Sequence, residues 1–230
     1  EYEPTLTAHE RSEILKGTAA EITARKDELA YGISLESGMS IKDSTKEVGR
    51  GVNLINVAAE EAKRIMGEQL PSDVDSSGAD KIIVAMRCPV GVVSAIVPFN
   101  RPMNQVVVKV APSFAAGNKT IIKPTERTPM SAIRFVQILL NNGMPPEMIS
   151  IVTGKSREIG DELVSSQKID MVTFTGSTDV GRKLTNMAGI KKLTMELGGN
   201  DPLIVLEDGD LDRAAKLTVA GAYGNAGQAC

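Results

Sequence analysis

The sequence predicts an α/β protein in which a doubly wound parallel sheet follows an N-terminal helical region. From residue 90 onward, short apolar runs alternate with amphipathic segments of helical length. Before residue 70, apolar residues recur instead at three- and four-residue steps. We therefore expect a helical part over residues 1–70 and an α/β part over residues 81–230.

The helical part is predicted to contain two helices, Ala8 to Leu35 and Lys42 to Met66, separated by a turn at "ESGMS". The polar loop "LPSDVDSSGAD" follows them. After this loop, "KIIVAMRCPVGVVSAIVP" contains two apolar, β-rich runs joined through Cys88 and Pro89. We expect these two runs to pair as a hairpin.

The α/β part alternates predicted strands with predicted helices. The strands are expected at residues 90–97, 120–123, 150–152, 171–175 and 193–196, and the helices at 102–116, 129–141, 156–165 and 178–188. Connections of this length predict a Rossmann-like parallel sheet with helices on both faces. Such sheets bind ligands at the carboxyl ends of their strands.

Composition excludes several classes of function. The net charge of −3 comes from mixed signs and provides no basic field for nucleic acid. The apolar runs are too short for a bilayer span, so we expect a soluble, cytoplasmic protein without a membrane partner. Two cysteines and one histidine argue against a disulfide framework and against a metal site. Any nucleophile in this chain must therefore be activated by something other than histidine, or by residues outside this sequence.

Polar residues stand where the predicted strands end. In "IIKPTE", Lys123 and Glu126 could both hydrogen-bond a ribose. In "FTGSTDVGR", Gly176 and Gly181 bracket a turn that begins near Ser177. That turn could aim helix amides at a phosphate, and an ordinary tight turn is an equally good interpretation.

Two further strand ends carry candidate catalytic groups. Asn100 in "VPFNRPMNQ" suits either a helix cap or an amide donor to a developing oxyanion, and nothing local separates these roles. Glu196 in "LTMELGG" closes an apolar strand just before two glycines. That position favours an accessible carboxylate.

Together, "VPFN", "KPTERTP", "FTGSTDVGR", "MELGGNDP" and "GQAC" resemble the ordered motifs of the NAD(P)-dependent aldehyde dehydrogenase superfamily. The resemblance implies that Cys230 attacks the aldehyde carbon, giving a thiohemiacetal that loses hydride to the nicotinamide and becomes a thioester. It implies that Glu196 is the general base for the hydrolytic water. It also implies that Asn100 and the backbone amide of Cys230 form the oxyanion hole.

The resemblance also implies a cofactor site. Its residues would be Pro98, Lys123, Glu126, Gly176, Ser177, Val180, Gly181 and Leu197. The carboxylate of Glu126 would favour a free 2′-hydroxyl over a 2′-phosphate, which predicts NAD rather than NADP. Some members with glutamate at this position accept both cofactors.

The segment "ESGMSIKDSTKEVGR" resembles the phosphonoacetaldehyde dehydrogenase branch and ends in Arg50. Arg101 follows Asn100, and arginine suits bidentate recognition of anionic groups. We expect a small anionic aldehyde such as phosphonoacetaldehyde or phosphonoformaldehyde. Lactaldehyde, succinate semialdehyde and glyceraldehyde 3-phosphate stay open, and a lone surface arginine such as Arg50 is usually only solvated.

Glu196 favours hydrolysis to the acid over the alternative of an acylating enzyme or acyl-phosphate reductase on the same fold. A protein that kept the fold and lost the chemistry is a second alternative, disfavoured because nucleophile, base and oxyanion donor are all present. The resemblance finally implies a homodimer or homotetramer. It also implies a longer enzyme whose catalytic domain begins near Cys230.

Overall fold

The computed structural model describes residues 6–229. Its N-terminal layer consists of α1 (Ala8–Ala24), α2 (Lys26–Ser37) and α3 (Ile41–Ala62). The first predicted helix is therefore two helices, which meet at Arg25, where the backbone leaves helical geometry (φ −102°, ψ 20°). Gly38 ends α2 with a positive φ of 74°, which confirms the predicted turn.

The sheet is parallel throughout, as predicted. Its strands are β3 (Val92–Ile96), β4 (Lys119–Lys123), β5 (Ile149–Ile151), β6 (Met171–Thr175) and β7 (Lys192–Glu196). Their order is β5-β4-β3-β6-β7. The chain therefore adds β4 and β5 on one side of β3 and then crosses back to add β6 and β7 on the other side. This reversal opens a crevice at the carboxyl ends of β3 and β6.

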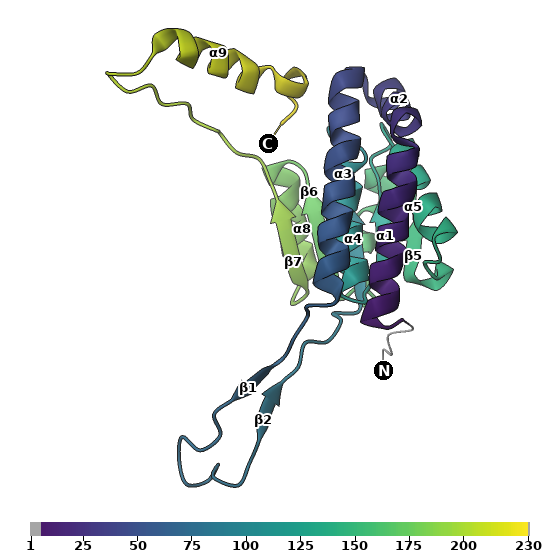
Figure 1. Ribbon diagram of the computed structural model, residues 1–230, viewed down its shortest axis with the longest axis vertical. Helices are drawn as coiled ribbons and strands as arrows, with labels where there is room; N and C mark the ends of the chain where they lie inside the picture. Colours follow the sequence, from purple (N-terminus) through teal and green to yellow (C-terminus); the bar gives the residue numbers. More distant parts are fainter. Residues whose placement is uncertain (1–5, 230) are drawn as a thin grey trace.

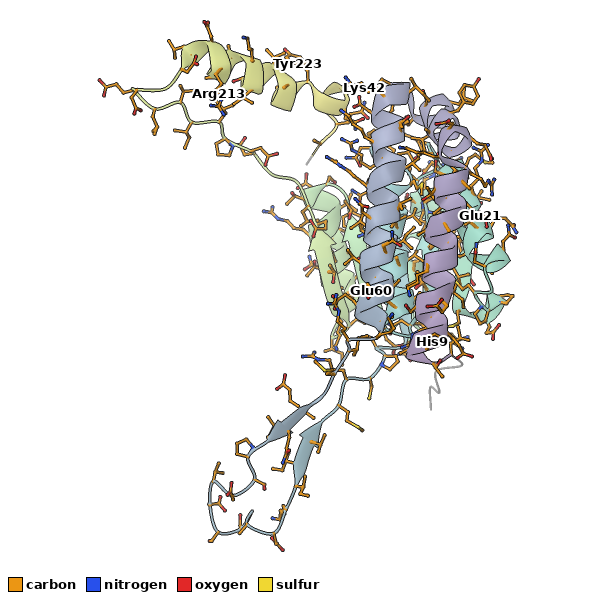
Figure 2. The ribbon with its side chains drawn as sticks, viewed as in Figure 1. His9, Glu21, Lys42, Glu60, Arg213 and Tyr223 are labelled. Atoms are coloured by element: carbon orange, nitrogen blue, oxygen red, sulfur yellow. The ribbon has the colours of Figure 1, made fainter. Side chains whose placement is uncertain are left out.

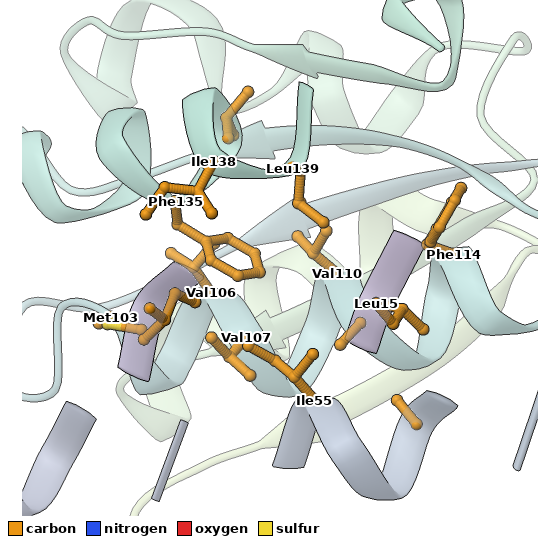
Figure 3. Close-up of a cluster of buried hydrophobic side chains, with 14 of the residues drawn as sticks. Leu15, Ile55, Met103, Val106, Val107, Val110, Phe114, Phe135, Ile138 and Leu139 are labelled. Carbon is orange, nitrogen blue, oxygen red and sulfur yellow. The ribbon is translucent and has the colours of Figure 1, made fainter. Parts of the chain in front are cut away.

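Helices cover both faces of this sheet. They are α4 (Asn104–Ala115), α5 (Met130–Asn141), the short η1 (Pro146–Met148), α6 (Ser156–Ile159), α7 (Glu162–Ser165) and α8 (Thr178–Ala188). Because strand side chains alternate between faces, Ile122 joins a large core with helices α1 to α5, whereas Ile121 packs on a smaller core beneath α8. Figure 3 shows the large core, where Val106 and Val110 of α4 lie among side chains such as Phe135 and Leu139.

The predicted hairpin through Cys88 and Pro89 is wrong. The first run forms β2 (Ile83–Ala85), which pairs antiparallel with β1 (Glu68–Leu70) across the polar loop. The second run is β3, a mostly buried central strand, whereas β1 and β2 are exposed. Figure 1 shows the β1–β2 hairpin extending away from the helical layer, so β2 and β3 cannot pair.

After β7, the chain leaves the sheet. Helix α9 (Leu211–Ala222) and the turn η2 (Gly224–Gly227) lie apart from the two cores, and no residue of either is buried. Figure 1 shows α9 running back toward α3. Within residues 6–229, no helix combines the length and apolar character that crossing a membrane requires.

Candidate active site

Asn100 lies in the loop that follows β3, and the returning end of the chain lies against it. Its Nδ2 donates a hydrogen bond to the backbone carbonyl of Gln228 at 2.7 Å. In return, Nδ2 of Asn225 donates to the carbonyls of Asn100 at 2.9 Å and Gln228 at 3.3 Å. Gln228 is two positions before Cys230, which itself lies outside the described residues. The interaction therefore joins the predicted oxyanion donor to the segment that leads into the predicted nucleophile.

A cavity of about 260 Å³ lies at the carboxyl ends of β3 and β6. Five residues that the sequence predicted for catalysis or cofactor binding line it together: Pro98, Asn100, Gly176, Ser177 and Leu197. Phe99 and Thr175 also line it, and the sequence analysis did not single them out. The cavity stands in the crevice where doubly wound sheets bind ligands.

The turn from β6 into α8 has the form predicted for it. Ser177 is the N-cap of α8, and its hydroxyl accepts a hydrogen bond from the amide of Val180 at 3.4 Å. A Cβ added at Gly181 would lie 2.4 Å from Leu197 Cδ2, so the end of the Leu197 side chain fills the space beside this glycine. The side chain of Val180 is 45% exposed and free to contact a ligand.

Lys123 and Glu126 lie at the end of β4, beside the Asn100 loop. Lys123 is buried, and its Nζ is 3.7 Å from Glu126 Oε2 and 3.2 Å from the Pro124 carbonyl. A hydrogen bond from the backbone amide of Glu126 lowers the pKa of its carboxyl group, and the charge of Lys123 lowers it further. Glu126 is therefore an anion at neutral pH in the position predicted for the ribose.

Glu196 ends β7, and its backbone carbonyl accepts a hydrogen bond from the amide of Gly176 at 3.1 Å. Its side chain is exposed and is not among the residues that line the cavity, whereas the next two residues are. The structure thus places the predicted base beside the cavity. Its role stays a prediction.

Lys109 on α4 is a buried titratable residue near the candidate site, and the sequence did not single it out. It is only 6% exposed, and its Nζ donates to Thr173 Oγ1 at 3.1 Å. Burial lowers the pKa of Lys109 to about 8, while the negative charge of Glu196 opposes this effect. The available signal was a lysine between Val108 and Val110 in an otherwise apolar stretch of helix.

The two arginines predicted for the substrate lie apart. Arg50 is exposed on α3 and lines a separate, open cavity of about 590 Å³ with Lys26 and Lys46. Arg101 is half-buried in the Asn100 loop, and its charge acts on the buried carboxylate of Glu47. Neither is among the residues that line the cavity beside Asn100, so their roles in substrate binding stay predictions.

The described residues contain no cluster of histidine, cysteine and carboxylate side chains that could hold a metal ion. Cys88, in the segment between β2 and β3, is exposed and has a free thiol. Along the carboxyl edge of the sheet lie an asparagine after β3, a lysine–glutamate pair at the end of β4 and the N-terminus of α8 after β6. These groups suit an anionic nucleotide and a polarised carbonyl.

Comparison with known proteins agrees with this geometry. The aldehyde dehydrogenase family model matches residues 4–230. The chain is 42% identical over 227 residues to the mitochondrial succinate-semialdehyde dehydrogenase of Arabidopsis thaliana, covering 98% of this chain and 42% of that protein. It is 39% identical over 226 residues to the 3-sulfolactaldehyde dehydrogenase of Priestia aryabhattai, covering 98% of this chain and 47% of that protein.

Among solved structures, the NADP-dependent glyceraldehyde-3-phosphate dehydrogenase of Bacillus halodurans C-125, complexed with NADP, superposes with a TM-score of 0.95 at 38% identity. The match covers 99% of this chain and 48% of that one. The chain thus spans about half the length of the relatives that it matches. The motifs, the doubly wound sheet and these matches agree, and the chain belongs to the aldehyde dehydrogenase family.

Proposed function

We propose that the protein containing this chain oxidises a small anionic aldehyde to its carboxylic acid, with NAD as the hydride acceptor. The hydrogen bond from Asn100 to Gln228 carries this proposal. It connects residues 128 positions apart and brings an amide donor to the segment just before Cys230. An amide at that place can stabilise the oxyanion that forms when a cysteine attacks an aldehyde.

In the proposed reaction, the thiolate of Cys230 adds to the aldehyde carbon while the amide of Asn100 donates to the developing oxyanion. Bound NAD supplies the acceptor for the hydride that leaves this carbon. Glu196 then removes a proton from water, which attacks the thioester and releases the acid and the thiol. The accessible position of Glu196 at the end of β7 supports this role.

The residues present fit a dinucleotide. Helix α8 begins after its N-cap Ser177, and Gly176 and Ser177 line the cavity, so the first amides of the helix are placed to meet a phosphate. The Lys123 and Glu126 pair offers a donor and an acceptor to ribose hydroxyls. The anionic carboxyl of Glu126 favours NAD, although the related Bacillus halodurans structure holds NADP.

The names of the three relatives described above support an anionic substrate. Succinate semialdehyde carries a carboxylate, 3-sulfolactaldehyde a sulfonate and glyceraldehyde 3-phosphate a phosphate. Half-buried Arg101, next to Asn100, has the chemistry to bind any of these groups. Phosphonoacetaldehyde and phosphonoformaldehyde are narrower candidates within the same class, and they rest on the sequence resemblance alone.

The experiment is a panel of aldehydes assayed with the whole protein and either cofactor. Succinate semialdehyde, 3-sulfolactaldehyde, the two phosphonate aldehydes and lactaldehyde are compared with propanal, a small uncharged control. We expect kcat/KM for one anionic aldehyde to exceed that for propanal by at least about 100-fold, the effect of roughly one buried charged pair. Equal values across the panel would contradict the anionic substrate, and acyl-coenzyme A as the main product would favour the acylating alternative.

A further inference from the structure

The carboxylate of Glu47 is buried where α3 packs on the start of α4. Its side chain is 0% exposed. Its Oε1 accepts hydrogen bonds from the backbone amides of Met103 at 2.9 Å and Asn104 at 3.1 Å. Figure 2 marks the Lys42 end of α3, and Glu47 lies near that end.

These two amides begin α4, and no side chain of the helix itself caps them. The first amides of a helix have no partner within the helix, so they must be satisfied from elsewhere. The side chain of Met103, at the N-cap position, has no oxygen that could accept from these amides. Glu47 provides the acceptor from a different helix. The start of α4 is thereby fixed to α3.

The loop that carries Asn100 leads directly into this first turn of α4. The carbonyl of Arg101 accepts from the amide of Gln105 at 2.9 Å, so the residue after Asn100 already takes part in the first turn of α4. The opposite end of the loop leaves β3 and is held to β4 by the hydrogen bond from Val97 N to the carbonyl of Lys123. A shift of Met103 and Asn104 would therefore move Asn100 relative to Gln228.

The close packing of α3 on α4 leaves little room for the contact between Glu47 and the start of α4 to shift. A Cβ added at Gly51, one turn after Glu47, would lie 3.1 Å from Asn104 Oδ1 and 3.3 Å from Met103 Cε. Oε2 of Glu47 has no hydrogen-bond partner among the described residues, so Oε1 alone makes the contact. Arg101 and Glu36 are the charged neighbours whose fields act on this carboxylate, with opposite signs.

We propose that Glu47 is a positioning residue that holds the Asn100 loop in the geometry needed for oxyanion stabilisation. The proposal rests on the function proposed above, and it gives α3 a part in catalysis without contact to the substrate. What Glu47 supplies is a single acceptor oxygen for two amides. A glutamine at this position carries an oxygen that can accept from both.

Glu36 is a matched control. It lies on α2 and accepts from the amides of Met130 and Ser131 at 2.9 Å each, so it caps α5 as Glu47 caps α4. Helix α5 does not lead into Asn100. Loss of either cap should cost stability, but only loss of the Glu47 cap should disturb the oxyanion donor.

The experiment compares Glu47→Ala, Glu47→Gln, Glu47→Asp and Glu36→Ala in the whole protein, by hydrogen–deuterium exchange and by kcat at saturating NAD and aldehyde. For Glu47→Ala, we expect faster exchange over residues 98–107 and a kcat roughly 10- to 100-fold lower, somewhat less than removal of an oxyanion donor. KM for NAD should stay within about twofold, because Lys123, Glu126 and Ser177, which are predicted to bind the cofactor, lie on other elements. Glu47→Gln should restore both properties.

Glu47→Asp keeps the charge but shortens the side chain by one methylene, which moves the acceptor oxygen away from the two amides. It should therefore give an intermediate loss of kcat, and it tests the proposal even if the alanine variant does not fold. Glu36→Ala should keep the kcat of the unaltered protein. The proposal is overturned if exchange over residues 98–107 is unchanged in Glu47→Ala, if Glu47→Gln loses as much kcat as Glu47→Ala, or if Glu36→Ala lowers kcat equally. If the unaltered protein oxidises no aldehyde, the proposed function fails, and the exchange data alone still decide whether Glu47 positions the loop.

Discussion

Asn100 donates its side-chain amide to the carbonyl of Gln228 at 2.7 Å, although 128 positions separate the two residues. If this amide stabilises the oxyanion, Asn100→Ala should lower kcat by roughly 100- to 1000-fold. KM for NAD should change little, because the loss falls on the transition state. Steady-state kinetics of the whole protein measure both, and a loss of less than about tenfold would leave Asn100 as a cap residue only.

The carboxyl of Glu126 is predicted to disfavour NADP. Glu126→Gln keeps the size and hydrogen-bonding capacity of the side chain and removes its charge. Because water screens this half-exposed group, we expect the ratio of kcat/KM for NADP to that for NAD to rise by only about tenfold. The ratio is measured with one aldehyde at saturation. An unaltered protein that prefers NADP would show that the charge of Glu126 does not set cofactor choice.

Gly181 allows the first turn of α8 to lie against Leu197, which lines the cavity. In Gly181→Ala, the added methyl would displace the end of the Leu197 side chain from the cavity wall, with little change in stability because this partly buried side chain can rotate. We expect KM for NAD to rise severalfold. Gly49→Ala is the control, since a Cβ there meets nothing within 4 Å. Equal KM values in the two variants would remove the argument for close packing at this turn.

Lys109 should make stability depend on pH. The folded protein holds its pKa at about 8, below the ordinary value of 10.5. Between these values the unfolded chain binds more protons, so Lys109 destabilises the fold below pH 8 and this effect fades as the pH rises toward 10.5. Lys109→Met should therefore increase the free energy of unfolding at pH 7, by on the order of 3 kcal/mol.

Urea unfolding at pH 7 and pH 9.5 tests this, with exposed Lys168→Met as the control. The stability difference between Lys109→Met and the unaltered protein should shrink at pH 9.5, while that of Lys168→Met should stay constant. A difference for Lys109→Met that is the same at both pH values would show that the lysine keeps its ordinary pKa in the fold.

The pattern of apolar residues predicted the parallel strands well, because each strand is a local apolar run bounded by turn residues. For example, the predicted strand over residues 171–175 matches β6. The pattern failed where pairing depends on distant residues. The partner of β2 is the segment Glu68–Leu70, whose sequence "EQL" has no strand pattern of its own. Likewise, the break at Arg25 interrupts an apolar periodicity that continues on both sides.

The candidate site shows the same division. Asn100 and Ser177 were predictable because each follows a strand at the end where parallel sheets bind ligands, whereas Pro98 came from the family resemblance alone. Glu47 and Lys109 were not, because their significance comes from burial against elements 56 and 64 positions away. In the sequence alone, Glu47 looks like an ordinary charged residue of an amphipathic helix, and Lys109 differs only in having valine on either side.

The central claim is that the thiol of Cys230 forms a thioester that Glu196 helps to hydrolyse. Glu196→Gln should slow hydrolysis and leave the earlier steps in place, so a single turnover with NAD should give a burst of NADH and an acyl group that remains on the protein. Mass spectrometry of proteolytic peptides then locates that group. The account predicts an acyl adduct on Cys230, one per active site, whereas an adduct on Cys88, or a burst without any adduct, would contradict it.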